Sequence, residues 1–112
     1  MAALALNTYK TVRSLVTTGI TTAYVVPNGV SSIHLYSVVS NVSTGIATVT
    51  VSHNRVGDGD PYELIKDARI PATDALNPVT GSLVLEVGDR IEIRGSSNNT
   101  MKFVMSILES AK

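Results

Sequence analysis

The stretch LVLEVGDRIEIR, residues 83–94, contains two short apolar runs separated by Gly88-Asp89. On each side of this dipeptide, Leu, Val or Ile recurs at every second position, the pattern of a β-strand with one buried face. Gly readily adopts the positive φ angle of a tight reversal, and an Asp side chain accepts hydrogen bonds from turn N–H groups. The stretch therefore predicts two strands joined by a turn, with Asp89 as the turn residue.

Asp89 also invites a catalytic interpretation, because it lies close in sequence to Glu86 and Glu92. A general acid needs a second carboxylate or a His beside it in a cleft. Both glutamates belong to the strand patterns that flank the turn, where we expect their side chains to point outward. The structural interpretation of Asp89 is therefore the simpler one.

The same pattern of strand residues interrupted by turn residues extends along most of the chain. Val, Ile and Thr dominate from Thr11 onward, and Gly, Pro, Asn or Ser interrupt them every 8 to 12 residues or so, a spacing typical of sandwiches and barrels. The sequence predicts an all-β fold: an antiparallel two-sheet β-sandwich of jelly-roll or immunoglobulin-like type. About eight strands are expected, at 11–18, 21–26, 31–42, 46–55, 62–70, 82–87, 89–95 and 100–109.

Two segments depart from this pattern. Residues 1–10 show no sustained period, so we expect a short N-terminal arm followed by one sandwich domain over residues 11–112. TDALN, residues 73–77, is compatible with a single helical turn. The arm lacks the basic start and the long apolar run of a signal peptide, so we expect no export by that route.

The clearest alternation lies near the C-terminus. One face of this strand carries Met101, Phe103, Met105 and Ile107 and is predicted to belong to the core. The opposite face is half apolar, which is unusual for a surface that meets only water; it carries Lys102, Val104, Ser106 and Leu108. Val84 is a similar case: it lies between Leu83 and Leu85, so it is an apolar residue on the face of its strand opposite to theirs. Either the second sheet or a neighbouring subunit covers these residues.

Composition excludes several classes of function. The 112 residues suffice for one domain with one core. Nine basic and nine acidic residues cancel, and the basic residues are scattered, so no field favours nucleic acid or an anionic membrane. No apolar run approaches the roughly 18 residues of a membrane helix. The chain has no Cys and therefore no disulfide or thiolate chemistry.

Candidate ligand sites are few. His34 and His53 lie on different predicted strands, without metal-ligand spacing around them, and we expect His34 at the surface or at an interface. Asp58, Asp60 and Glu63 are close together but lack the order of a calcium loop, and a hairpin tip explains them more simply. No nucleophile elbow or phosphate-binding loop occurs. We predict no catalytic, cofactor or metal site, and no small-molecule substrate.

Several short motifs recur in a characteristic order. A V-P-x-G turn at residues 26–29 precedes a strand ending at Asn41, and Ile70-Pro71-Ala72 follows. A strand then enters L-E-x-G-D at residues 85–89, and the chain closes on S-x-L-E at residues 106–109. In this order and spacing, from about Ala23 to Glu109, the chain resembles small β-sandwich virion proteins of tailed bacteriophages.

The resemblance implies a structural, non-enzymatic role. Such proteins decorate or cement capsids, or build tail, collar or fibre parts, typically as symmetric oligomers. We expect a capsid decoration protein, made in the host cytoplasm and located on the virion surface. It would be a homo-oligomer, with a trimer favoured, and would contact the major capsid protein. The candidate interface residues are Leu4, Leu6, Tyr9, His34, Tyr36, Val84, Val104 and Leu108.

A tail, collar or fibre component is the alternative within the virion. An alternative of another class is a carbohydrate-binding module on the same architecture. That function needs exposed aromatic platforms, and in the absence of Trp only Tyr9, Tyr24, Tyr36 and Tyr62 are available.

Overall fold

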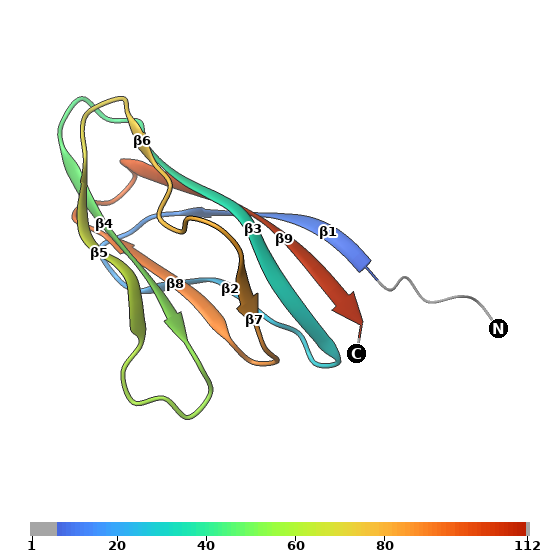
Figure 1. The fold of residues 1–112 in the computed structure, drawn as a ribbon. Helices are drawn as coiled ribbons and strands as arrows, with labels where there is room; N and C mark the ends of the chain where they lie inside the picture. Colours follow the sequence, from blue (N-terminus) through green and yellow to red (C-terminus); the bar gives the residue numbers. More distant parts are fainter. Residues whose placement is uncertain (1–6, 112) are drawn as a thin grey trace.

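Two antiparallel sheets face one another in the computed structural model, which describes residues 7–111 (Figure 1). One sheet has the order β1-β9-β3-β6, with β7 also paired to β3, and the other has the order β2-β8-β4-β5. The predicted all-β sandwich is confirmed. The strands are β1 (Asn7–Leu15), β2 (Thr21–Val25), β3 (Val30–Asn41), β4 (Ala47–Asn54), β5 (Tyr62–Ile70), β6 (Ala75–Leu76), β7 (Leu83–Leu85), β8 (Arg90–Gly95) and β9 (Met101–Ala111).

Two segments differ from the sequence-based expectation. The first strand begins at Asn7, so residues 7–10 belong to β1 and not to an arm. The segment expected to form a helical turn instead contains β6, because Ala75 and Leu76 pair with Ser40 and Val39 of β3. Long-range pairing supplies their backbone hydrogen bonds, which a single isolated turn of helix would have to form alone.

The core lies between the sheets and is centred on β9. Met101, Phe103, Met105 and Ile107 are all at most 1% exposed, as the alternation predicted. They belong to one buried cluster with the inward side chains of the facing sheet, including Val49, Val51, Ile91 and Ile93. Burial of these aliphatic groups, each worth about 1.5–3 kcal/mol, is the main force that holds the sheets together.

No helix long and apolar enough to cross a membrane occurs between residues 7 and 111.

Replacing Phe103 by Ala should lower the free energy of unfolding by about 3–5 kcal/mol, because it leaves a cavity where the ring is 1% exposed. Urea titration followed by circular dichroism measures this change. Tyr62→Ala is the control, since Tyr62 is 71% exposed and its loss should change stability by less than about 0.5 kcal/mol. Equal effects of the two substitutions would contradict the placement of the core.

Candidate functional site

The outer face of the β1-β9-β3-β7 sheet carries a continuous row of apolar side chains. The strand register places Tyr9 of β1 beside Leu108 of β9, Leu108 beside Ile33 of β3, and Ile33 beside Val84 of β7. Directly opposed residues of neighbouring strands point to the same side of a sheet. Four apolar residues from four strands therefore lie across this face.

Further apolar residues adjoin this row. The register continues with Tyr36 beside Ser106, with Val38 beside Val104, and with Val104 beside Arg13. Tyr9, Tyr36 and Val84 are more than half exposed, with values of 75%, 52% and 61%. We call this surface the apolar face; it comprises Tyr9, Ile33, Tyr36, Val38, Val84, Val104 and Leu108.

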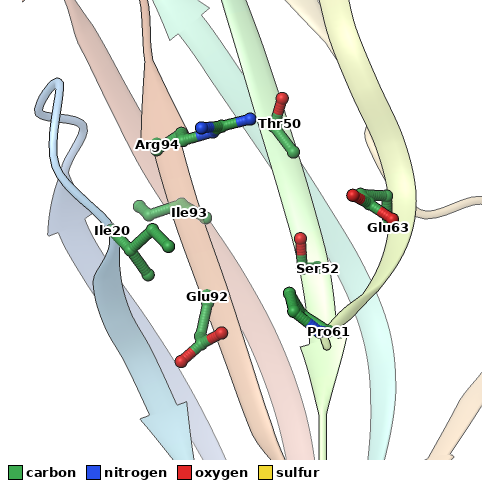
Figure 2. A pocket seen from close by; sticks show the side chains of 8 residues that line it. All are labelled: Ile20, Thr50, Ser52, Pro61, Glu63, Glu92, Ile93 and Arg94. Atoms are coloured by element: carbon green, nitrogen blue, oxygen red, sulfur yellow. The ribbon is translucent and has the colours of Figure 1, made fainter. Parts of the chain in front are cut away.

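The outer face of the opposite sheet is polar. Its central strands present Thr50 and Ser52 from β4 and Glu92 and Arg94 from β8, with Glu63 of β5 alongside (Figure 2). These side chains line a shallow groove together with Ile20, Pro61 and Ile93. None of the lining residues is aromatic, so the groove lacks the stacking platform expected of a sugar-binding site. This face suits contact with water, whereas the apolar face does not.

The structure excludes one of the two alternatives that the sequence left for the outward residues of β9. The second sheet packs against the inner residues of β9, so it does not cover Val104 or Leu108. Both are half-buried. Of the predicted interface residues, Tyr9, Tyr36, Val84, Val104 and Leu108 lie together on the apolar face. Leu4 and Leu6 lie outside the described residues.

His34 is a correction to the predicted interface. Its side chain is 1% exposed, because a register shift between His34 and Tyr36 lets Ile33 and Leu35 point outward and His34 inward. Nδ1 lies 3.0 Å from the Gly81 carbonyl oxygen, and Nε2 lies 2.9 Å from the Ser37 hydroxyl. Because a carbonyl only accepts, Nδ1 carries the proton in this arrangement. The ring stabilises the 77–82 connection against β3.

Asp89 occupies the turn predicted for it and is also the centre of a buried ion cluster. The turn contains Gly88 with a φ angle of 84°, and the Glu86 N–H donates to Asp89 Oδ2 over 2.9 Å. The Asp89 side chain is completely buried. Arg55 donates from Nε to Oδ1 over 2.9 Å and from Nη2 to Oδ2 over 3.0 Å, and His53 Nε2 lies 2.9 Å from Oδ2.

This cluster argues against acid catalysis by Asp89. The Arg55 hydrogen bonds lower the pKa of the Asp89 carboxyl most strongly, and the Glu86 N–H and His53 add to them. They outweigh burial, which acts in the opposite direction, so the pKa lies well below its usual range. A carboxylate this stable holds no proton to donate near neutral pH. Its effect is to link the loop after β4 to the β7–β8 turn.

A second polar cluster connects three strands of one sheet to β2. Tyr24 of β2 donates its hydroxyl proton to Glu109 of β9 over 2.5 Å, and the same hydroxyl lies 2.7 Å from the Ser32 hydroxyl of β3. Lys10 of β1 is 3.3 Å from the other Glu109 oxygen. Burial, followed by the hydrogen bond to Glu109, raises the pKa of Tyr24 above its usual value. Tyr24 therefore serves as an internal link and not as an exposed platform.

The acidic hairpin tip does not form a ligand cluster. Asp58 accepts a hydrogen bond from the Arg55 backbone N–H over 3.3 Å, as in a turn, and Glu63 lies in the groove of the other face. Within residues 7–111, no group of three or more His, Asp or Glu side chains is arranged to hold a metal ion.

Comparison with known proteins shows the fold but no family. No protein-family model and no curated protein sequence matches the chain. A chain from the structure of Bacillus endospore appendages, described as disulfide-linked pili, aligns with a TM-score of 0.55 and 12% identity, covering 100% of this chain and 98% of its own. A chain from the capsid structure of Helicobacter pylori bacteriophage KHP30 aligns with a TM-score of 0.56 and 10% identity. The alignment covers 95% of the present chain and 88% of the phage chain.

Replacing Asp89 by Asn should destabilise the protein by about 1–3 kcal/mol at pH 7, because the donors around this carboxylate lose their charged acceptor. The pKa of Asp89 is lower in the folded than in the unfolded protein, where it is about 3.9. Its contribution to the free energy of unfolding is therefore complete at a pH well above about 3.9 and declines as the pH falls through and below this value. Urea unfolding between pH 7 and pH 3 should therefore show the difference between wild type and variant shrinking with acidification.

Asp60→Asn is the matched control, because it makes the same chemical change at an exposed position in a loop. A difference for Asp89→Asn that stays constant from pH 7 to pH 3 would contradict the role of the ionised carboxylate.

Proposed function

We propose that the protein is a non-enzymatic structural component of a phage virion, a decoration protein that binds the capsid shell through its apolar face. The observation that carries the proposal is the row of Tyr9, Leu108, Ile33 and Val84 across four strands. Soluble domains rarely leave a continuous apolar surface exposed unless a partner covers it. A sandwich of the same fold in a phage capsid structure supports this choice of partner.

The mechanism is burial of this face against the major capsid protein. Each square ångström of apolar surface removed from water contributes about 25 cal/mol, part of which offsets the loss of free motion on binding. A protein that binds only the assembled shell stabilises that shell by mass action. The ion clusters around Asp89 and Glu109 keep the strands that carry the face in a fixed arrangement, which is a structural task and not a catalytic one.

Residue chemistry favours the capsid over a pilus of the compared type. The endospore appendages are described as disulfide-linked, and this chain has no Cys. It therefore cannot form disulfide links to its neighbours, whereas its apolar face is suited to non-covalent contacts. A tail, collar or fibre position would use the same face and is the alternative; the location of the protein in the particle distinguishes the two.

Val84→Lys should weaken binding to capsids assembled without the protein by about tenfold or more, a loss of at least 1.4 kcal/mol, because it places a charge in the contact. Co-sedimentation of purified protein with such capsids measures the effect. Val25→Lys is the matched control: Val25 is 50% exposed and lies on the opposite outer face, beside Arg90. Equal binding of wild type and Val84→Lys would exclude the apolar face, and attachment to tails instead would support the alternative.

A further inference from the structure

Among the residues that the structure describes, 7–111, strand β1 forms an edge of its sheet that no other strand pairs with. All nine of its residues pair with β9 on one side, from Asn7 opposite Ser110 to Leu15 opposite Lys102. On the other side, no strand of residues 7–111 pairs with it. Nine residues in a strand extend over about 30 Å, so a long row of backbone N–H and C=O groups is available for another strand.

The other edges of the sandwich are protected. β2 has five residues and a register shift between Thr22 and Tyr24, and β5 has two shifts in its pairing with β4. The edge of β3 is covered in part by β6 and β7. Short strands, irregular pairing, Pro and charged side chains are ways in which proteins prevent edge-to-edge association. β1 is long, its register with β9 is regular and it contains no Pro; of these devices it has only the charges of Lys10, which is paired with Glu109 of its own chain, and Arg13.

We propose that two copies of this protein pair through β1, antiparallel and centred on Thr11, so that their sheets join into one. In this register Asn7 lies opposite the partner's Leu15 and all nine residues are paired. Symmetric antiparallel pairing places the same face of both copies on the same side. The apolar faces of the two copies therefore form one continuous surface.

The side chains of β1 suit this register. Tyr9 lies opposite the partner's Arg13 in two symmetry-related pairs, a geometry in which a guanidinium can contact an aromatic ring. Lys10 lies opposite Val12, so no like charges oppose each other. Lys10 is also paired with Glu109 of its own chain, at 3.3 Å, whereas Arg13 has no ion-pair partner among residues 7–111. Centring the pair one residue earlier would instead oppose Lys10 to the partner's Lys10.

The first test is the oligomeric state of the full chain, measured by light scattering and analytical ultracentrifugation at several concentrations. The proposal expects a monomer–dimer equilibrium. A protein that stays monomeric at every concentration, or the trimer expected from the family resemblance, would overturn it. The outcome does not depend on which particle the protein belongs to, so this test and the capsid-binding test succeed or fail separately.

Two substitutions at one exposed position should act in opposite directions. Tyr9→Glu places a carboxylate opposite the partner's Arg13 and should lower the dimer dissociation constant, whereas Tyr9→Arg opposes like charges and should raise it, each by about two- to thirtyfold. Tyr9 is 75% exposed, so neither change removes a core contact. Tyr36→Glu and Tyr36→Arg, on the same face but on β3, are the controls and should leave the constant unchanged. Effects of equal sign at position 9 would contradict the register.

A disulfide test locates the symmetry axis. The chain has no Cys, so Thr11→Cys introduces a single thiol. Directly opposed residues lie about 4.5–5.5 Å apart, within the range that a disulfide can bridge, and mild oxidation should give a covalent dimer. Arg13→Cys is the control, because its two copies lie four residues, about 13 Å, apart. Cross-linking at both positions to the same extent, or at neither, would overturn pairing centred on Thr11.

Discussion

The pairing of β9 with both β1 and β3 is the constraint on which the rest of the structure depends. This strand is central in its sheet, and its inner residues, from Met101 to Ile107, form the middle of the core. Because strand side chains alternate, the same eleven residues also set the outer face, through Val104 and Leu108. Core and surface are therefore coupled: a one-residue slip in this register would expose the core residues and bury Lys102.

Two polar clusters fix how loops and edge strands join, which hydrophobic burial alone does not specify. Apolar contacts between sheets are non-directional and do not by themselves fix how loops and edges join. The Asp89 carboxylate, bound by Arg55, His53 and a backbone N–H, connects the β4–β5 hairpin to the β7–β8 turn. Glu109 connects β9 to β1 and β2 through Lys10 and Tyr24. These contacts hold the strands that present the apolar face and the open edge of β1, the two surfaces proposed to meet partners.

Predictions from sequence were accurate where local pattern is enough. Alternation identified the core residues of β9 and the unusual apolar parity of Val84, Val104 and Leu108, and turn chemistry identified Asp89. His34 was misplaced because the register shift before Tyr36 reverses the expected parity, and no residue type marks such a shift in advance. Arg55 was missed as the partner of Asp89, since 34 residues separate them and only the pairing of β4 with β8 brings them together.

The sequence by itself determined the all-β class, most strand positions and the residues that form the core, because period-two alternation and turn residues act over a few neighbouring positions. Only the tertiary structure decided which sheet has the apolar outer face, that β6 is a strand, that His34 is buried, and that no second strand among residues 7–111 pairs with β1. Those features depend on the order and register of strands far apart in the chain, and the free energy that selects them comes from contacts that no local segment contains.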